Sequence, residues 1–238
     1  MPKAMSERTD VLQTHAADFW LARGAVVLVA ALQLFTSARV TVGPKLLAPG
    51  LEIALLIPLS VATAWTHRRA GRVRDGEAQR ALLQTRIWVR RLALLLTALV
   101  TGANLGSLIL LVRGVILGKA GPAPALLLDA ADIWLTNLIV FALWFWNIDR
   151  WAPPSRGLDR EGPPEFLFTA MLPEAGPKKN WTPGFLDYLY LAFTNATALS
   201  PADTLPLTVR AKMLMMVQAC VSLITIVVVA ARAVNVLQ

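Results

Sequence analysis

The C-terminal quarter of the chain reads Phe185-Leu-Asp-Tyr-Leu-Tyr-Leu-Ala-Phe-Thr-Asn-Ala-Thr-Ala-Leu-Ser-Pro-Ala-Asp-Thr-Leu-Pro-Leu-Thr208, and an apolar run over residues 213–236 follows it. The quoted stretch opens with an aromatic segment and continues with a threonine-rich segment that is broken at Pro201. Asp203 and Pro206 then stand just before the apolar run. That run is long enough to cross a bilayer as a helix. A short segment, a loop and a full span in this order predict a helical membrane hairpin.

The composition of the whole chain also indicates a membrane protein. Of 238 residues, 56% are hydrophobic and 16% are charged, whereas soluble domains carry roughly 25% charged residues. The formal net charge is +8. The arginines lie between apolar runs, so membrane topology explains the charge better than nucleic-acid binding does. One cysteine and two histidines leave no intrachain disulfide and no Cys/His metal cluster.

Five apolar runs are candidates for transmembrane helices. They cover residues 19–35, 51–65, 92–112, 126–148 and 213–236. We therefore expect an all-α, polytopic transmembrane helix bundle with five or six spans, which forms one integral membrane domain over residues 1–238. Residues 1–125 would supply the N-terminal helices. Residues 126–238 would supply an outer helix, a Pro-rich loop, the short segment 185–208 and an inner helix.

A charge-dense loop, residues 67–91, separates the second and third runs. It holds Arg68, Arg69, Arg72 and Arg74 near its start, and its later part has the pattern of an amphipathic helix. The positive-inside rule places this loop in the cytoplasm. The same arginines also suit anionic lipid headgroups, and the two interpretations are compatible.

Polar side chains inside the spans offer two candidate sites. Asp129 and Asp132 are three residues apart and share a helix face, so they form either an acidic vestibule for cations or a hydrated helix end. Gln218, Ser222 and Thr225 follow at i, i+4 and i+7 on one stripe of the last span. A polar stripe in a membrane helix faces protein or water rather than lipid. It would therefore line an inner cavity or join helices within the protomer.

The C-terminal stretch resembles the pore helix, filter and inner helix of potassium-channel-like proteins. Phe193 and Thr197 stand where such a pore helix ends in an aromatic residue and a threonine-rich run. Asp203 and Pro206 stand where those proteins carry an Asp just after the filter and a Pro a few residues on, and Arg210 falls near the start of the inner helix. The resemblance implies a re-entrant pore-like loop, monovalent cations as the transported species and a homo-oligomer.

The filter itself departs from that pattern. The glycines that let backbone carbonyls point at the ion are replaced by Ser200, Pro201 and Ala202, and proline fixes φ near −65°. A conducting path would then use side chains and select weakly among cations. The side chains that would line it are those of Asn195, Thr197, Ser200 and Asp203.

A broader resemblance covers most of the chain. Residues 187–204, 210–216 and 231–236, with upstream agreement at 134–141 and 165–168, look like a family of uncharacterised actinobacterial integral membrane proteins. This resemblance implies a multi-pass protein of the bacterial inner membrane and supplies no activity.

The topology predicted from the arginines disagrees with the topology that the pore resemblance requires. With the arginine loop inside, four spans return the chain to the cytoplasm near Asp149, whereas potassium-type pore loops enter from outside. Alternatively, residues 185–199 cross as a short additional span. About 15 residues reach only roughly 22 Å, which is short of a core of roughly 30 Å.

No catalytic motif is present: the sequence has no HExxH, GxSxG or Walker loop, and we expect neither an enzyme nor a bound cofactor or metal. The leading hypothesis is an oligomeric ion-channel-like protein with a degenerate filter. The alternatives are a small-solute transporter, since polar residues and prolines interrupt several spans, and a non-conducting membrane scaffold.

Overall fold

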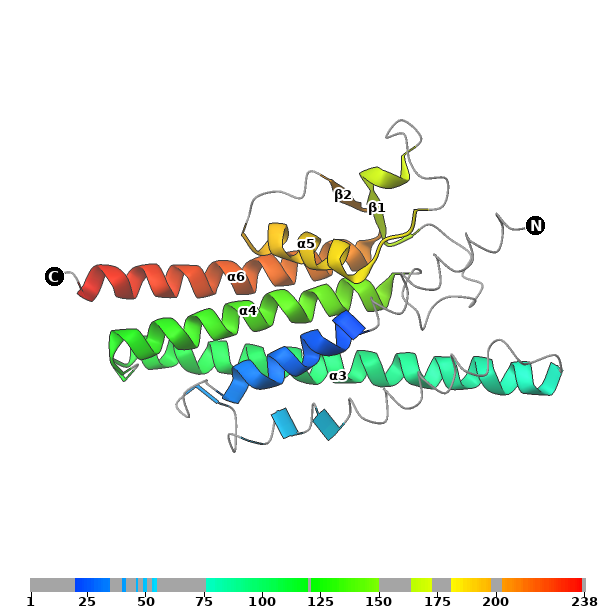
Figure 1. The fold of residues 1–238 in the computed structure, drawn as a ribbon. Coiled ribbons are helices and arrows are strands. Elements are labelled where there is room, and N and C mark those ends of the chain that lie inside the picture. The colour runs from blue at the N-terminus through cyan, green and yellow to red at the C-terminus, as the bar shows by residue number, and fades with distance from the viewer. Residues whose placement is uncertain are drawn as a thin grey trace.

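The computed structural model describes residues 20–34, 40–41, 46, 49–50, 53–54, 76–119, 121–149, 164–172, 181–197 and 203–236. This part of the chain is mostly helical, with five helices and one small sheet. Three long helices lie side by side, and the shorter Trp20–Leu34 helix and α5 (Phe185–Ala196) pack alongside them (Figure 1). The arginines at 68, 69, 72 and 74, like Ser200 and Pro201 and most of the second predicted span, lie outside the described residues.

Helices α3 (Gly76–Ile116) and α4 (Ala123–Ile148) form an antiparallel hairpin. The end of α3 is a Schellman motif: Lys119 N–H donates to Gly114 C=O at 2.8 Å and Gly118 N–H to Val115 C=O at 3.2 Å. Gly118 has φ of 66°, which glycine adopts without steric cost. Pro122 then precedes α4, because proline suits a helix start.

Helix α3 begins earlier than the predicted third span. Its first sixteen residues, 76–91, belong to the segment that the sequence analysis assigned to the arginine-rich loop. Alanine, leucine, glutamine and arginine dominate this part and are strong helix formers. The expected amphipathic helix and the third span are therefore one continuous helix of 41 residues.

Helix α4 lies at the centre of the described bundle. Its C-terminal half is buried almost without interruption from Thr136 to Ile148, and Ala142 and Phe145 are completely buried. Neighbours cover it on several sides: α3, α5 (Phe185–Ala196), α6 (Val209–Val236) and the Trp20–Leu34 helix, whose Ala22, Val26 and Val29 belong to the same core. The central helix therefore positions the rest of the C-terminal half.

A two-stranded antiparallel sheet, which the sequence analysis did not anticipate, closes one end of the bundle. Strand β1 (Phe166–Phe168) pairs with β2 (Thr204–Pro206), with Leu167 opposite Leu205. Phe166 is fully buried, and its ring meets Phe145 at 5.2 Å and Tyr188 at 6.2 Å. A 3₁₀ turn, η1 (Thr169–Met171), follows β1. Strands of three residues carry no recognisable period, so pairing between distant segments is what defines them.

Three described helices are long and apolar enough to cross a membrane. They contain the segments Ile87–Ile116, Ala123–Ile148 and Val209–Ala231, and the shorter apolar helix Trp20–Leu34 accompanies them. They coincide with the third, fourth and last predicted spans. The expectation of a helical membrane protein is confirmed at this level.

Candidate functional site: the polar contacts of α5

Helix α5 starts at the end of the bundle where α4 finishes. Its first residue, Phe185, packs edge-on against Trp146 of α4 at 5.6 Å. The Tyr188 hydroxyl donates to Asp149 Oδ2 at 2.8 Å, and the Glu165 N–H donates to Asp149 Oδ1 at 3.3 Å. Both Tyr188 and Asp149 are fully buried. The carboxylate directly after α4 therefore joins α4, β1 and α5.

The far end of α5 lies beside the middle of α6. Asn195 Nδ2 donates to Gln218 Oε1 at 2.7 Å and to Met215 C=O at 2.9 Å. Gln218 Nε2 in turn donates to Ala192 C=O at 2.8 Å. Gln218 is completely buried, so these reciprocal amide contacts fix the position of α5 along α6.

Helix α4 contributes a third side chain to the same network. Asn137 Nδ2 donates to Ser222 Oγ at 2.8 Å and to Gln218 C=O at 3.3 Å. Asn137 is 1% exposed. We call the set Asn137, Asn195, Gln218 and Ser222 the polar clasp. It joins α4, α5 and α6 in the interior of the described bundle.

A small void adjoins the polar clasp on the side of α3. It has a volume of about 20 Å³, and Thr101, Asn104 and Asn137 supply its polar lining. That volume is sufficient for one water molecule. Thr101 Oγ1 also accepts a hydrogen bond from Trp144 Nε1 at 2.8 Å, which adds a polar link between α3 and α4.

After α5 the chain returns to the end of the bundle at which α5 begins. Thr169 N–H donates to Asp203 C=O at 2.9 Å, and Leu207 N–H donates to Glu165 C=O at 2.9 Å. Thr208 then caps α6: its Oγ1 accepts the Ala211 N–H at 3.1 Å and donates to Glu165 Oε2. Glu165 also pairs with Arg210 at 3.5 Å. The segment between α4 and α6 thus enters and leaves at one end of the bundle (Figure 1).

The predicted stripe on the last span is buried inside the chain. Gln218, Ser222 and Thr225 are 0%, 1% and 2% exposed. Two of them belong to the polar clasp, and the Thr225 hydroxyl donates to Val221 C=O at 2.8 Å on its own helix. Among the described residues these side chains make contacts within the protomer, which is the second of the two interpretations given above.

The pore-like residues that the structure describes are not gathered on one face. Asn195 belongs to the polar clasp. Thr197 follows the last turn of α5 and donates to Phe193 C=O at 2.9 Å and Thr194 C=O at 3.2 Å. The Asp203 side chain is exposed near β2.

The acidic pair lies inside α4 rather than at its first turn. Asp129 is the seventh residue of the helix and is 5% exposed, while Asp132 is half-buried. Both residues make interactions within the protein. No group of three His, Cys, Asp or Glu residues suited to a metal ion occurs among the described residues.

Sequence reasoning missed Asn137, Tyr188 and Asp149 as members of these networks. Asn137 and Asp149 carried a weak signal, since polar residues within or beside apolar runs are costly unless they have partners. The partners themselves, 81 or 39 residues away, could not be recognised in the sequence.

Comparisons with known proteins identify no relative: no family model, no curated protein and no solved structure matches the chain.

Proposed function

We propose that this chain is an oligomeric, ion-channel-like protein of the bacterial inner membrane, in which α4, α5 and α6 act as outer helix, pore helix and inner helix. The observation that carries the proposal is the path of the chain between α4 and α6. Helix α5 has 12 residues, about 18 Å at 1.5 Å per residue, which is too short to cross a core of roughly 30 Å. It points inward along α6, and the chain is back at β1 by Asp203.

The depth that α5 reaches supports a re-entrant element. Asn195 bonds to Met215 and Gln218, the seventh and tenth residues of α6. These positions lie roughly 9 to 14 Å from the start of α6, close to half of the hydrocarbon core. Irregular backbone at that depth is tolerated only where protein or a water-filled cavity surrounds it. A second copy of the chain would supply that surrounding.

The conducting path runs between copies of the chain. Within one protomer the void beside the polar clasp holds about 20 Å³, which is too small for a solute and disfavours a transporter whose substrate site is built there. Monovalent cations pass the side chains of the loop after α5, Thr197, Ser200 and Asp203 among them, with weak selectivity because Pro201 interrupts the filter.

Reconstitution in liposomes tests this proposal. Purified protein is expected to be an oligomer by native mass spectrometry and to carry potassium and sodium ions at similar rates. Asp203→Asn is expected to lower the flux, and Asp203→Glu, which keeps the charge, to preserve most of it. A monomer without cation flux would rule the proposal out.

One observation favours a non-conducting scaffold as the second candidate. The polar stripe of α6 is turned into the protomer, and the exposed side chains of α6 include Met213, Met216, Leu223 and Val227. A pore lined by that face would be hydrophobic. The scaffold candidate predicts a membrane protein that co-purifies in fixed ratio and no flux at any applied gradient.

A further inference from the structure

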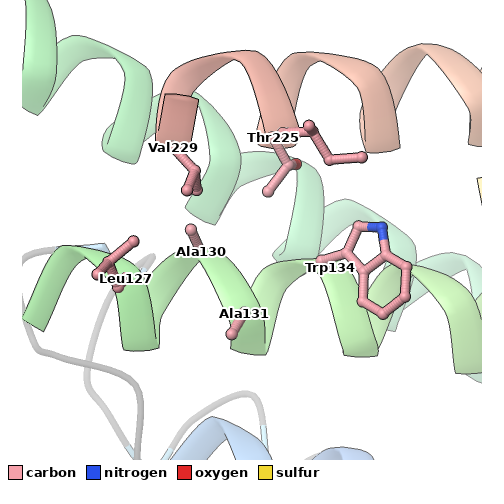
Figure 2. A pocket seen from close by; sticks show the side chains of 7 residues that line it. Leu127, Ala130, Ala131, Trp134, Thr225 and Val229 are labelled. Carbon is pink, nitrogen blue, oxygen red and sulfur yellow. The ribbon is translucent and has the colours of Figure 1, made fainter. Parts of the chain in front are cut away.

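An apolar groove lies between α4 and α6, on the other side of Trp134 from α5. Its volume is about 410 Å³, and its lining consists of Leu127, Ala130, Ala131, Trp134, Thr225, Ile226 and Val229. Figure 2 shows Leu127 and Ala130 of α4 facing Thr225 and Val229 of α6, with Trp134 further along α4. Ala130 and Thr225 are buried and form the floor, whereas Leu127 and Ile226 are 47% exposed and form the rim.

The lining is largely hydrocarbon, although the Trp134 indole N–H is buried without a hydrogen-bond partner in the described residues. Six of the seven lining side chains are apolar, and the hydroxyl of Thr225 is already bonded to Val221 C=O. The volume falls within the range of ordinary ligand pockets, roughly 300 to 1,000 Å³. Both walls of the groove, α4 and α6, belong to segments that are long and apolar enough to cross a membrane. If these segments span the bilayer, the groove faces the acyl chains of the surrounding lipids.

The depth of the groove matches one leaflet of a bilayer. Leu127 and Trp134 lie four and eleven residues after the start of α4, roughly 6 and 17 Å along the helix. Half of a hydrocarbon core of roughly 30 Å is about 15 Å. The groove therefore extends from just below the end of the bundle to about its middle. Trp134 marks the inner limit, where its ring meets Phe193 of α5 edge-on at 6.4 Å.

The charge at the outer limit suits an anionic headgroup. Arg113 lies in the last turn of α3 and Lys119 in the turn between α3 and α4, and both are exposed; the sequence has no Asp or Glu from residue 113 to residue 128. The next acidic residues, Asp129 and Asp132, are not among those that line the groove. A phosphate at the turn would meet two cations without a neighbouring carboxylate.

We infer that the groove binds one acyl chain of an anionic phospholipid whose headgroup phosphate rests on Arg113 and Lys119. The inference does not depend on ion conduction, because a scaffold with this α4–α6 pair would bind the same lipid. It assigns a specific lipid site to the end of the bundle opposite the start of α3 (Figure 1).

Native mass spectrometry of the purified full-length chain in mild detergent, with phosphatidylglycerol and phosphatidylcholine added in equal amounts, tests the inference. The wild type is expected to retain one phosphatidylglycerol per chain. Ala131→Phe, which fills the groove from its exposed rim, is expected to weaken retention about tenfold, since it displaces about two buried methylene groups. Leu128→Phe is the matched control, because Leu128 is 72% exposed on the same helix and lies outside the groove.

A second pair of variants tests the headgroup. Lys119→Gln is expected to reduce the preference for phosphatidylglycerol over phosphatidylcholine. Lys212→Gln is expected to leave this preference unchanged, because Lys212 lies near the start of α6 and the groove lies near its end.

If Ala131→Phe does not fold, Ile226→Phe fills the groove from the facing helix. Equal retention by Ala131→Phe and Leu128→Phe overturns the inference. So does a wild-type oligomer that retains no lipid and separates into single chains on Ala131→Phe, since a second copy would then occupy the groove.

Discussion

At the scale of single residues, the polar clasp shows what polar side chains do inside an apolar bundle. Gln218 both donates and accepts through its side-chain amide, to Ala192 C=O and from Asn195. Interhelical hydrogen bonds in membrane proteins contribute roughly 0.6 kcal/mol each on average. Their larger effect is on specificity, because any other position of α5 along α6 would leave buried amides without partners.

Gln218→Leu is expected to destabilise the protein by about 1 to 3 kcal/mol, because it removes two buried side-chain hydrogen bonds, the one from Asn195, which keeps only its bond to Met215 C=O, and the one to Ala192 C=O. Ser222→Ala is expected to cost less, since Asn137 keeps its bond to the Gln218 carbonyl. Thermal unfolding in detergent, followed by intrinsic tryptophan fluorescence, measures both. Cys220→Ser, at an exposed position of the same helix, is the control. An unfolding temperature for Gln218→Leu equal to that of the control would show that the clasp is energetically unimportant.

Tyr188→Phe removes only the hydroxyl that donates to Asp149. Because the Asp149 carboxylate is completely buried, the loss of one donor is expected to cost about 1 to 3 kcal/mol. Tyr190→Phe is the matched control, since Tyr190 is 55% exposed on the same helix. The same unfolding measurement checks this pair, and equal losses for the two variants would contradict the assigned role of Asp149.

At the scale of elements, alanine substitutions at two glycines, one within α3 and one in the turn after it, are expected to change the stability of the protein in opposite directions. Gly118 has φ of 66° in the turn after α3, so Gly118→Ala is expected to destabilise the protein by about 1 to 2 kcal/mol. Gly102 lies inside α3 with nothing within 4 Å of an added Cβ. Gly102→Ala is expected to stabilise by about 0.5 to 1 kcal/mol. Chemical denaturation in detergent gives the free energy of unfolding of both variants. If both substitutions changed this free energy in the same direction, the bounds of α3 would be contradicted.

Helix α5 depends on its surroundings more than the long helices do. Twelve residues are too few for a stable isolated helix in water, and none of its contacts with α4, β1 and α6 is local in the sequence. Asp187 supports its start by accepting the Gly184 N–H at 2.7 Å. Variants of the polar clasp and of Asp149 should therefore loosen α5 before they affect the α3–α4 hairpin.

At the scale of the whole molecule, the antiparallel hairpin brings distant parts of the chain to one end of the bundle. The arginine-bearing start of α3 and the end of α4 lie at the same end of the bundle as β1 and the start of α5 (Figure 1). By the positive-inside rule, we expect that end to face the cytoplasm. Under our proposal α5 then enters from the cytoplasmic side, opposite to the pore loops of the potassium-channel type.

Single cysteines in a Cys220→Ser background test this orientation. Thr169→Cys and Lys119→Cys lie at exposed positions at opposite ends of α4, so an impermeant thiol reagent should reach only one of them in intact cells. We expect labelling at position 119 and protection at position 169. Labelling at 169 alone would reverse the orientation, and equal labelling at both would contradict α4 as a span.

The sequence by itself determined the class of this protein and the positions of its long helices. Apolar runs near the thickness of a bilayer can only be satisfied as membrane helices, so three predicted spans coincide with the apolar segments of α3, α4 and α6 within about five residues, although α3 itself begins sixteen residues before the predicted span. Gly118 and Gly121 have positive φ and Pro122 precedes α4, so the turn between the first two helices follows from local backbone preferences.

Only the tertiary structure decided how the C-terminal half is arranged. The sequence left Gln218, Ser222 and Thr225 as either cavity lining or helix contacts, and gave no sign that Phe166 and Pro206 would pair in a sheet. It also left residues 185–199 as either a short crossing or a re-entrant segment; that choice stays a prediction, and the structure adds that α5 ends at Ala196 beside the middle of α6. The reason is physical: a side chain's role depends on which partners distant segments bring within hydrogen-bonding distance.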